Sequence, residues 1–342
     1  MSRETLISVL KNLHHDSLIG KELELCWHLG EPLAVGLDYY EEMTPAIEEF
    51  AAGKFAVEYT FQTNGLLINE AWCRFFKSIN AQVGVSLDGP KEFHDCHRVD
   101  RRGDGTYDQV MMGLRLLQQA EVSHYIIAVL STNALREPDR IFDFFSELGE
   151  TNICFNIEES EGINISQTAR SDEACPLVRT FFHRFLERLA DDTTGVWVRD
   201  LQQMLGRLMT ARDGDCINEN NLPLRIVSVS WDGTWTTFSP ELIATPAPKF
   251  RNFRFGNLAE EPVSSSLKRS SFGDALQDIT EGVEKCRAEC SYFSLCGGGA
   301  PSNKFTELGT LTGTETFACR SMVKSLADGC MDFIEGNILH SD

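Results

Sequence analysis

The sequence predicts an α/β fold with a parallel sheet, followed by a smaller C-terminal domain that holds metal. Strand-like and helical segments alternate regularly through the first half of the 342-residue chain, which is typical of crossover units and a parallel sheet. Polar loops follow the predicted strands. Four cysteines gather in a loop-rich region near the C-terminus, and together these observations define the fold class.

The predicted elements of the first half follow one another with few residues between them. Residues 3–13 place Leu6, Leu10 and Leu13 at helical spacing, and ELELCW is typical of a short strand that runs into a loop. Periodicity then predicts helix 37–52, strand 56–62, helix 69–79, strand 82–87, helix 107–121, strand 124–130, helix 137–148 and strand 152–157. The sequence leaves open whether the resulting sheet is open or forms an incomplete barrel.

The second half has a different pattern. A long helical stretch, roughly residues 173–212 with a break near Gly195, separates it from the first half. Residues 225–240 alternate around Asp232-Gly233, which is a strong hairpin signal. The loop-rich remainder predicts a small domain with little core, to whose folding bound metal contributes free energy.

Composition and charge narrow the function. A formal net charge of −20 disfavours nucleic-acid binding, which needs basic residues to displace counterions from phosphates. No apolar run could span a bilayer, and the start MSRETLISVL lacks the regions of a signal peptide, so we expect a cytoplasmic protein without membrane contact. Phosphate-loop, nucleophile-elbow and H-E-x-x-H motifs are absent from the sequence, which removes most support for simple hydrolases and nucleotidases.

The cysteines near the C-terminus suggest a metal site. Cys286, Cys290, Cys296 and Cys319 form the pattern C-x3-C-x5-C-x22-C, and 11 cysteines in a reducing compartment are expected to remain thiols. Four thiolates complete a tetrahedral zinc site or anchor a [4Fe–4S] cluster. Zinc favours C-x2-C pairs, and the glycines at 297–299 would let backbone amides approach cluster sulfurs. Iron–sulfur, zinc and unrelated buried cysteines all remain open at this point.

Four loops follow predicted strands, namely WHLGEP at 27–32, TNG at 63–65, SLDGP at 86–90 and STN at 131–133. Ligands of parallel α/β domains bind at the carboxyl ends of strands, so these loops should face one pocket. Glu31 could hold the ammonium of an amino-acid-like ligand. His28 is more typical of a core histidine than of a catalyst, and the charged stretch 86–108, taken alone, is more typical of an ordinary strand–turn–helix connection than of a binding site.

Taken together, these stretches resemble the radical SAM/SPASM enzymes, in particular the peptide maturases near the sulfatase-maturating group and the cyclophane-forming branch. WHLGEPL is similar to the WHxGEPL motif of the family, QTNGLLINEAWCRFF and VGVSLDGPKEFHDCHRVD resemble its barrel, and FSPEL and CSYFSLCGGGAPSNK resemble its C-terminal region. The resemblance covers nearly the whole chain. It implies an incomplete (β/α)6 radical SAM-type barrel missing its first strand, at residues 1–195, and a SPASM-like auxiliary cluster domain with a helical linker, at residues 196–342.

The resemblance also implies cofactors and the residues that bind them. Gly30, Glu31 and Pro32 would contact the methionine end of S-adenosylmethionine (SAM). Ser86 and Asp88 would line the same pocket. The four cysteines of the C-terminal pattern would hold an auxiliary [4Fe–4S] cluster, while no catalytic side chain is implied.

The chain departs from the family pattern in two ways. Family members begin with a strand and a C-x3-C-x2-C loop that ligates the SAM-cleaving cluster, but no such triplet occurs here and the first cysteine is Cys26. We therefore expect an N-terminally shortened chain that cannot cleave SAM as written, since cleavage needs an iron with an open coordination position. Phe238 occupies the place of an expected SPASM cysteine, so one auxiliary cluster is predicted, with Cys216 as the upstream candidate for a second.

The leading hypothesis from the resemblance is a radical SAM-dependent maturase that cross-links side chains of a ribosomally synthesised precursor peptide. An active enzyme would need an electron donor such as flavodoxin or ferredoxin. The alternative is a non-catalytic protein that binds a peptide or a partner enzyme and keeps a structural metal site. A third possibility is structural zinc in a protein of another activity.

Overall fold

The computed structural model describes residues 1–150, 152–160, 165–211 and 215–338. Its main sheet has six strands in sequential order, each parallel to the next. These strands are β1 (Glu22–Trp27), β2 (Ala56–Thr63), β3 (Gln82–Ser86), β4 (His124–Leu130), β5 (Asn152–Ile157) and β6 (Trp197–Val198). A sequential order is typical of a barrel wall, because a doubly wound sheet reverses its order at a switch point. No pairing joins β1 to β6 among the described residues, so the wall is a partial barrel.

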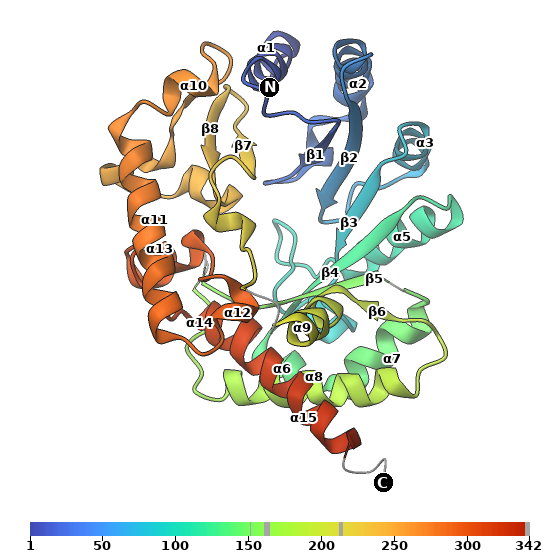
Figure 1. The fold of residues 1–342 in the computed structure, drawn as a ribbon. Coiled ribbons are helices and arrows are strands. Elements are labelled where there is room, and N and C mark those ends of the chain that lie inside the picture. The colour runs from blue at the N-terminus through green and yellow to red at the C-terminus, as the bar shows by residue number, and fades with distance from the viewer. Residues whose placement is uncertain (151, 161–164, 212–214, 339–342) are drawn as a thin grey trace.

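Most helices of the first half lie outside this wall, whereas the last one, α9, lies at the β5–β6 end of the sheet (Figure 1). They are α1 (Arg3–His15), α2 (Leu37–Ala51), α3 (Glu70–Ser78), α4 (Lys91–His94), α5 (Tyr107–Gln119), α6 (Thr132–Leu135), α7 (Pro138–Leu148), α8 (Ala174–Ala190) and α9 (Arg199–Thr210). Their ends agree with the sequence signals: Asn69 caps α3, while Pro138 opens α7 and Gly149 ends it in the left-handed conformation. Among the described residues, no helix is both long and apolar enough to cross a lipid bilayer.

Strand β6 corrects the prediction of one helical stretch over residues 173–212, of which residue 212 lies outside the described residues. The break near Gly195 is confirmed, since Gly195 has φ +83° between α8 and the strand. Trp197 pairs with Asn152 and Val198 with Ile153 of β5. Pairing with a distant strand overrides the local helical pattern here. The proposed domain boundary, between residues 195 and 196, lies immediately before β6 and stays a prediction.

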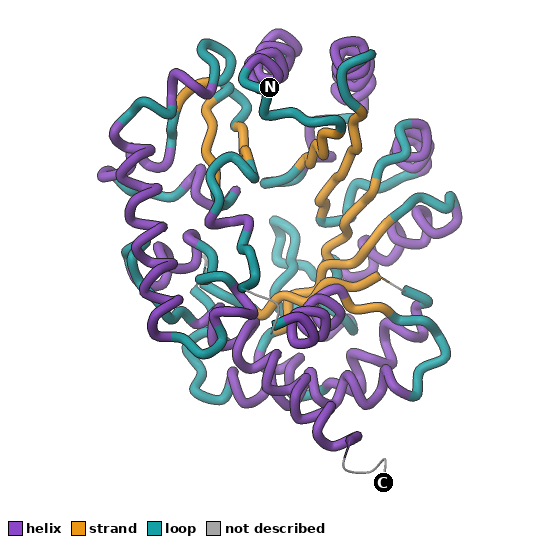
Figure 2. Tube along the Cα trace, viewed as in Figure 1, coloured by secondary structure: helices purple, strands orange, loops and turns teal. Residues whose placement is uncertain are grey.

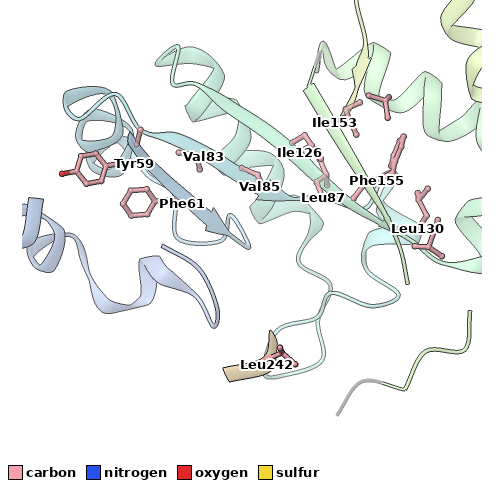
Figure 3. Close-up of a cluster of buried hydrophobic side chains, with 14 of the residues drawn as sticks. Tyr59, Phe61, Val83, Val85, Leu87, Ile126, Leu130, Ile153, Phe155 and Leu242 are labelled. Carbon is pink, nitrogen blue, oxygen red and sulfur yellow. The ribbon is translucent and has the colours of Figure 1, made fainter. Parts of the chain in front are cut away.

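The two faces of the sheet differ in polarity. Phe61, Val83, Val85, Ile126 and Phe155 lie on one face and are fully buried (Figure 3). On this face, aromatic rings of the strands pack against those of the helices. For example, the ring centroids of Phe61 on β2 and Phe76 on α3 are 5.1 Å apart. Its apolar character agrees with a helix-covered outer face of a barrel.

Polar side chains dominate the opposite face. The strand register places Glu24, Gln62, Ser86, Tyr125 and Asn156 on it, and all five are at least partly exposed. A doubly wound sheet is apolar on both faces because helices cover both. The polar face therefore decides the question that the sequence left open, and the sheet is an incomplete barrel with a polar interior.

The C-terminal region begins with a small antiparallel sheet, distinct from the main one in Figure 2. It comprises β7 (Val227–Val229), β8 (Thr234–Thr237) and β9 (Gly256–Asn257), and the predicted hairpin at Asp232-Gly233 is confirmed between β7 and β8. The helices α10 (Val263–Ser266), α11 (Ser270–Glu289), α12 (Phe293–Cys296), α13 (Pro301–Leu308), α14 (Phe317–Cys319) and α15 (Leu326–Ile338) follow, with a π-helical turn at Arg320–Ser325.

The expectation of a loop-rich domain with little core is wrong. Helix α11 has 20 residues, and Trp235, Phe238, Phe255 and Phe272 are buried together against it and the small sheet. Buried aromatic side chains supply large apolar areas even in short segments, so this region has a core of its own.

Both ends of the chain attach the C-terminal region to the barrel. In Figure 1, α1 lies beside α10, and Asn12 Nδ2 donates to the Leu258 carbonyl at 2.8 Å while the Asp16 carboxylate accepts from the N–H and Oγ of Ser264 at 2.8 and 3.0 Å. At the other end, Arg179 of α8 pairs with Asp332 of α15 at 2.6 Å. The C-terminal region thus spans from the β1 edge of the sheet to the α8 side.

The half-buried His124 and the buried Glu150 form a pair that we expect to stabilise the fold in a pH-dependent way. His124 Nε2 lies 3.1 Å from Glu150 Oε1. Burial lowers the pKa of His124, but the hydrogen bond and charge of Glu150, with the Val122 carbonyl, outweigh burial and raise the pKa above its ordinary value. A raised folded-state pKa means that the pair stabilises the fold fully below the unfolded value of about 6.5, and the contribution is lost as pH rises through the folded-state pKa.

We expect Glu150→Gln to lower the free energy of unfolding by about 1 kcal/mol or more at pH values near 6 and by less near pH 9, because the charged pair exists only when His124 is protonated. Urea unfolding at the two pH values measures the difference. Glu121→Gln, at an exposed glutamate paired with Lys77, is the matched control and should change little. An equal loss at both pH values for Glu150→Gln would contradict the assignment.

Candidate functional site

The loop after β1 makes a tight turn at the carboxyl end of the sheet. Leu29 and Gly30 have positive φ values of +70° and +63°, a conformation that suits glycine and turns the chain sharply. Pro32 opens a 3-10 turn over Pro32–Val35, and its carbonyl accepts from Tyr40 OH at 2.9 Å. The turn places Glu31 against the end of β2.

Three donors hold the Glu31 carboxylate. Thr63 Oγ1 and the Leu33 N–H donate to Oε1 at 2.7 and 3.0 Å, and the Asn64 N–H donates to Oε2 at 2.8 Å. A carboxylate offers about four acceptor positions. Glu31 is half-buried, so one acceptor position remains for a ligand cation such as an ammonium.

Ser86 and Asp88 have different surroundings. Ser86 lies on the polar face, where Gln62 Nε2 is 3.5 Å from its Oγ. Asp88 is buried, and it accepts two hydrogen bonds from Arg98, at 2.6 and 3.0 Å, and one from the Val129 N–H, at 2.9 Å. The carboxylate of Asp88 therefore ties the loop after β3 to β4, while Ser86 is open to the interior.

His28 differs from its prediction as a core histidine. It is exposed at the end of β1, since alternation continues the side of the strand that carries Glu24 and Cys26. The alternation of side chains along β1 places His28 on the exposed side, beside the loop that carries Glu31.

The structure brings the four cysteines of the C-terminal pattern together. Cys286, Cys290, Cys296 and Cys319 line one cavity of about 140 Å³. They come from α11, from the residue after α11, from α12 and from α14. No group of three or more His, Cys, Asp or Glu side chains among the described residues lies close enough to bind a single metal ion.

This arrangement suits a cluster better than zinc. Four sulfurs bound to one zinc ion at 2.3 Å lie about 3.8 Å apart, whereas the irons and sulfides of a cluster hold their cysteine ligands further apart. The Gly298 N–H donates to Cys296 Sγ at 3.4 Å, and the residues 297–299 all have positive φ. The glycine run thus lets a backbone amide approach the Cys296 sulfur, a type of contact that tunes iron–sulfur clusters.

Lys304 is a site residue that the sequence did not reveal. Its side chain is only 2% exposed, and Nζ lies 3.6 Å from Cys286 Sγ. Burial raises the pKa of the Cys286 thiol, and the neighbouring Lys304 ammonium opposes that rise. The only sequence signal was its position shortly after the cysteines, in a helical segment where a lysine is normally exposed.

A larger cavity, of about 750 Å³, lies between the cysteine site and the barrel interior. Cys296 and Cys319 line both cavities. Asn156 of the polar sheet face, Arg199 of α9 and Cys216 line the larger one as well. This cavity is large enough for several side chains of a ligand, and sequence reasoning did not identify its α9 wall.

Comparisons with known proteins agree with this architecture, although no family model matches the chain. An uncharacterized protein of Synechocystis sp. is 39% identical over 318 residues, which cover 92% of this chain and 80% of the relative. The cysteine-type anaerobic sulfatase-maturating enzyme of Clostridium novyi is 28% identical over 280 residues, covering 80% of this chain and 72% of that enzyme.

Solved structures show the same fold. The structure of anSMEcpe with bound AdoMet matches with a TM-score of 0.79 at 20% identity, covering 99% of this chain and 86% of that chain. SuiB of Streptococcus suis, bound to S-adenosylmethionine, matches with a TM-score of 0.57 at 13% identity, covering 93% and 70%. The predicted α/β fold class with an incomplete parallel barrel is confirmed, because both solved structures share this fold. The characterised homologues of this chain are anaerobic sulfatase-maturating enzymes, which are radical SAM/SPASM enzymes and are similar to it over 80% or more of its length.

Proposed function

We propose that this protein acts in radical SAM-dependent modification of a ribosomally synthesised peptide, by joining side chains of that peptide. The observation that carries the proposal is the cavity of about 750 Å³ between the polar barrel interior and the cysteine site. A peptide segment there would have the SAM site on one side and the auxiliary cluster on the other. Structures of anSMEcpe with bound AdoMet and the Kp18Cys peptide, which match with a TM-score of 0.77, support a peptide as the ligand.

The SAM site is proposed at the carboxyl ends of β1 and β3. Gly30, Glu31 and Pro32 would hold the methionine end, with the remaining acceptor position of Glu31 binding its ammonium. Ser86 would line the pocket directly, whereas the buried Asp88 would act by holding the loop in place. When bound to a reducing cluster, SAM supplies a carbon radical, which is chemistry that protein side chains lack.

We assign one auxiliary [4Fe–4S] cluster, held by the four cysteines that share a cavity. A second cluster has little support, because Phe238, at the place of an expected cysteine, is fully buried in the aromatic core. An active enzyme would take electrons from a flavodoxin or a ferredoxin. All 11 cysteines are unpaired, which favours a reducing compartment, and we place the protein in the cytoplasm.

Binding and cleavage of SAM test the proposal separately. We expect a polypeptide of residues 1–342, reconstituted anaerobically with iron and sulfide, to bind SAM and to release no 5′-deoxyadenosine, since its sequence contains no C-x3-C-x2-C triplet. Glu31→Gln should weaken SAM binding about tenfold or more, because the ammonium loses a charge-assisted partner. Isothermal titration calorimetry measures the affinity, and mass spectrometry detects 5′-deoxyadenosine.

Glu42→Gln, on the exposed face of α2, is the matched control and should bind SAM like the unchanged chain. Thermal unfolding of Glu31→Gln separates a binding defect from a folding defect. Absence of SAM binding by the unchanged chain contradicts the cofactor assignment, and robust 5′-deoxyadenosine production contradicts the expected inability to cleave.

The same cavity of about 750 Å³ also suits a second candidate function, that of a non-catalytic protein that binds a peptide or a partner enzyme. In such a protein the metal site would have a structural role. This second function predicts peptide binding that is independent of SAM, whereas a maturase should bind its peptide more tightly when SAM is present. Peptide titrations with and without SAM distinguish the two.

A further inference from the structure

One face of α9 forms a wall of the larger cavity. Arg199, Gln203 and Arg207 are spaced four residues apart, which places them on the same side of the helix. All three line the cavity. Their side chains carry N–H donors, and the two guanidinium groups accept no hydrogen bonds, so this wall is suited to an acceptor-rich ligand.

The two arginines differ in what they already bind. Arg199 donates to Asp200 Oδ1 from Nε and Nη2, at 3.2 and 2.8 Å. Asp200 Oδ2 accepts from the Phe155 N–H at 2.7 Å, which fixes the start of α9 to β5. Arg207, two turns further along, makes no hydrogen bond or ion pair with any part of the described chain. Arg207 is half-buried, and its guanidinium is available to a ligand.

The two carboxylates that line the same cavity, Glu159 and Glu219, already have partners within the protein. Asn303 Nδ2 donates to Glu159 Oε2 at 2.6 Å, and Arg225 Nη2 lies 2.7 Å from Glu219 Oε1. The chain carries a net charge of −20, so acidic partners for Arg207 would be plentiful on most surfaces. Because Arg207 lines a cavity and has no partner among the described residues, we look to a ligand for the negative charge.

The cysteine site does not account for Arg207. The cations that act on these cysteines are Lys304, beside Cys286, and Lys324, beside Cys319. Lys304 Nζ lies 3.6 Å from Cys286 Sγ, and Lys324 lines the cysteine cavity. Arg207 does not line the cysteine cavity, and it faces the space in which a substrate would lie.

We infer that Arg207, assisted by Gln203, binds a carboxylate of the peptide substrate. Guanidinium and carboxylate groups pair through two parallel hydrogen bonds, which gives both affinity and orientation. The carboxylate belongs either to an Asp or Glu side chain or to the C-terminus of the peptide. This inference rests on the proposed function, because it names a chemical requirement of its substrate.

The test uses the reconstituted protein of residues 1–342 and a library of randomised short peptides displayed on phage. The unchanged protein should enrich Asp or Glu at one position, and Arg207→Gln should lose this enrichment. Synthetic peptides of the enriched sequence should bind Arg207→Gln about 10- to 100-fold more weakly than the unchanged protein. Arg207→Glu should reverse the preference and enrich Lys or Arg at that position, a gain that misfolding cannot produce.

Synthetic peptides also identify the source of the carboxylate. Replacing Glu by Gln in the peptide removes the side-chain carboxylate, and a C-terminal amide removes the terminal carboxylate. Only one of these two changes should abolish the difference in peptide affinity between the unchanged protein and Arg207→Gln. Arg115→Gln, an exposed arginine of α5, is the matched control and should leave every preference intact.

The inference is overturned if Arg207→Gln prefers acidic peptides and free C-termini as strongly as the unchanged protein does. The proposed function is unaffected by that result. The same holds if Arg207→Gln shifts only the reduction potential of the cluster. Failure of the unchanged protein to bind any peptide counts against the proposed function as well.

Discussion

Replacement of Cys296 by alanine should remove the auxiliary cluster, lowering bound iron from about four atoms per chain to nearly none. Cys296 is buried at the end of α12 and lines the cysteine cavity together with the three other proposed ligands. The midpoint of thermal unfolding should fall as well, since ligand binding to the folded state stabilises it. Iron and sulfide analysis of anaerobically reconstituted protein measures the first effect, and calorimetry measures the second.

Cys330→Ala is the control for this prediction. Cys330 is fully buried on α15, and burial alone raises its pKa to about 12. It does not line the cysteine cavity, so iron and sulfide should be unchanged and only a modest packing loss is expected. Retention of iron by Cys296→Ala, or a single zinc without sulfide in the unchanged protein, would refute the cluster assignment.

Replacement of Lys304 by methionine should lower the reduction potential of the auxiliary cluster by an amount on the order of 100 mV. Reduction adds negative charge to the cluster, and a buried ammonium 3.6 Å from a ligand sulfur favours the reduced form. Methionine keeps much of the side-chain volume and removes the charge. A redox titration followed by electron paramagnetic resonance measures the midpoint, and iron content shows whether the cluster is retained.

Two further variants show whether charge at this position is responsible. Lys304→Arg keeps the charge and should restore most of the potential. Lys324→Met removes a more exposed lysine that already pairs with Glu315, so its effect should be smaller because solvent screens it. Equal potentials for Lys304→Met and the unchanged protein would show that Lys304 has a packing role only.

The prediction of the first half was accurate because its signals are local. Each predicted helix from 37–52 to 137–148 ends within a few residues of its observed bounds, since apolar periodicity and capping residues lie inside the segment itself. Strand β6 was missed, as two residues carry no periodicity and only their pairing with β5 defines a strand.

The C-terminal region was predicted less well for a related reason. Helix α11 contains two glycines and few large apolar residues near its centre, so the pattern did not indicate a 20-residue helix. Contacts with distant segments support it, as where the ring of Phe272 meets that of Phe255. The cysteine pattern, in contrast, was recognisable because four thiols at short spacing are rare in chains without a metal site.

Lys304 and Arg207 illustrate what sequence patterns could not predict. In a helix, one lysine or one arginine is normally a solvent-exposed side chain. Lys304 became a candidate because helix packing buries it beside Cys286. Arg207 became one because the acidic groups around its cavity already have partners.

By itself, the sequence determined the succession of strands and helices, the polar loops at the strand ends and the grouping of four cysteines. Each of these depends on residue type and spacing within a short window of the chain. Only the tertiary structure decided that the sheet has a polar interior, that a cavity joins this interior to the cysteines, and which cations lie there. These properties depend on segments distant in the sequence, because burial and charge pairing are set by which surfaces meet when the C-terminal region packs across the open side of the barrel.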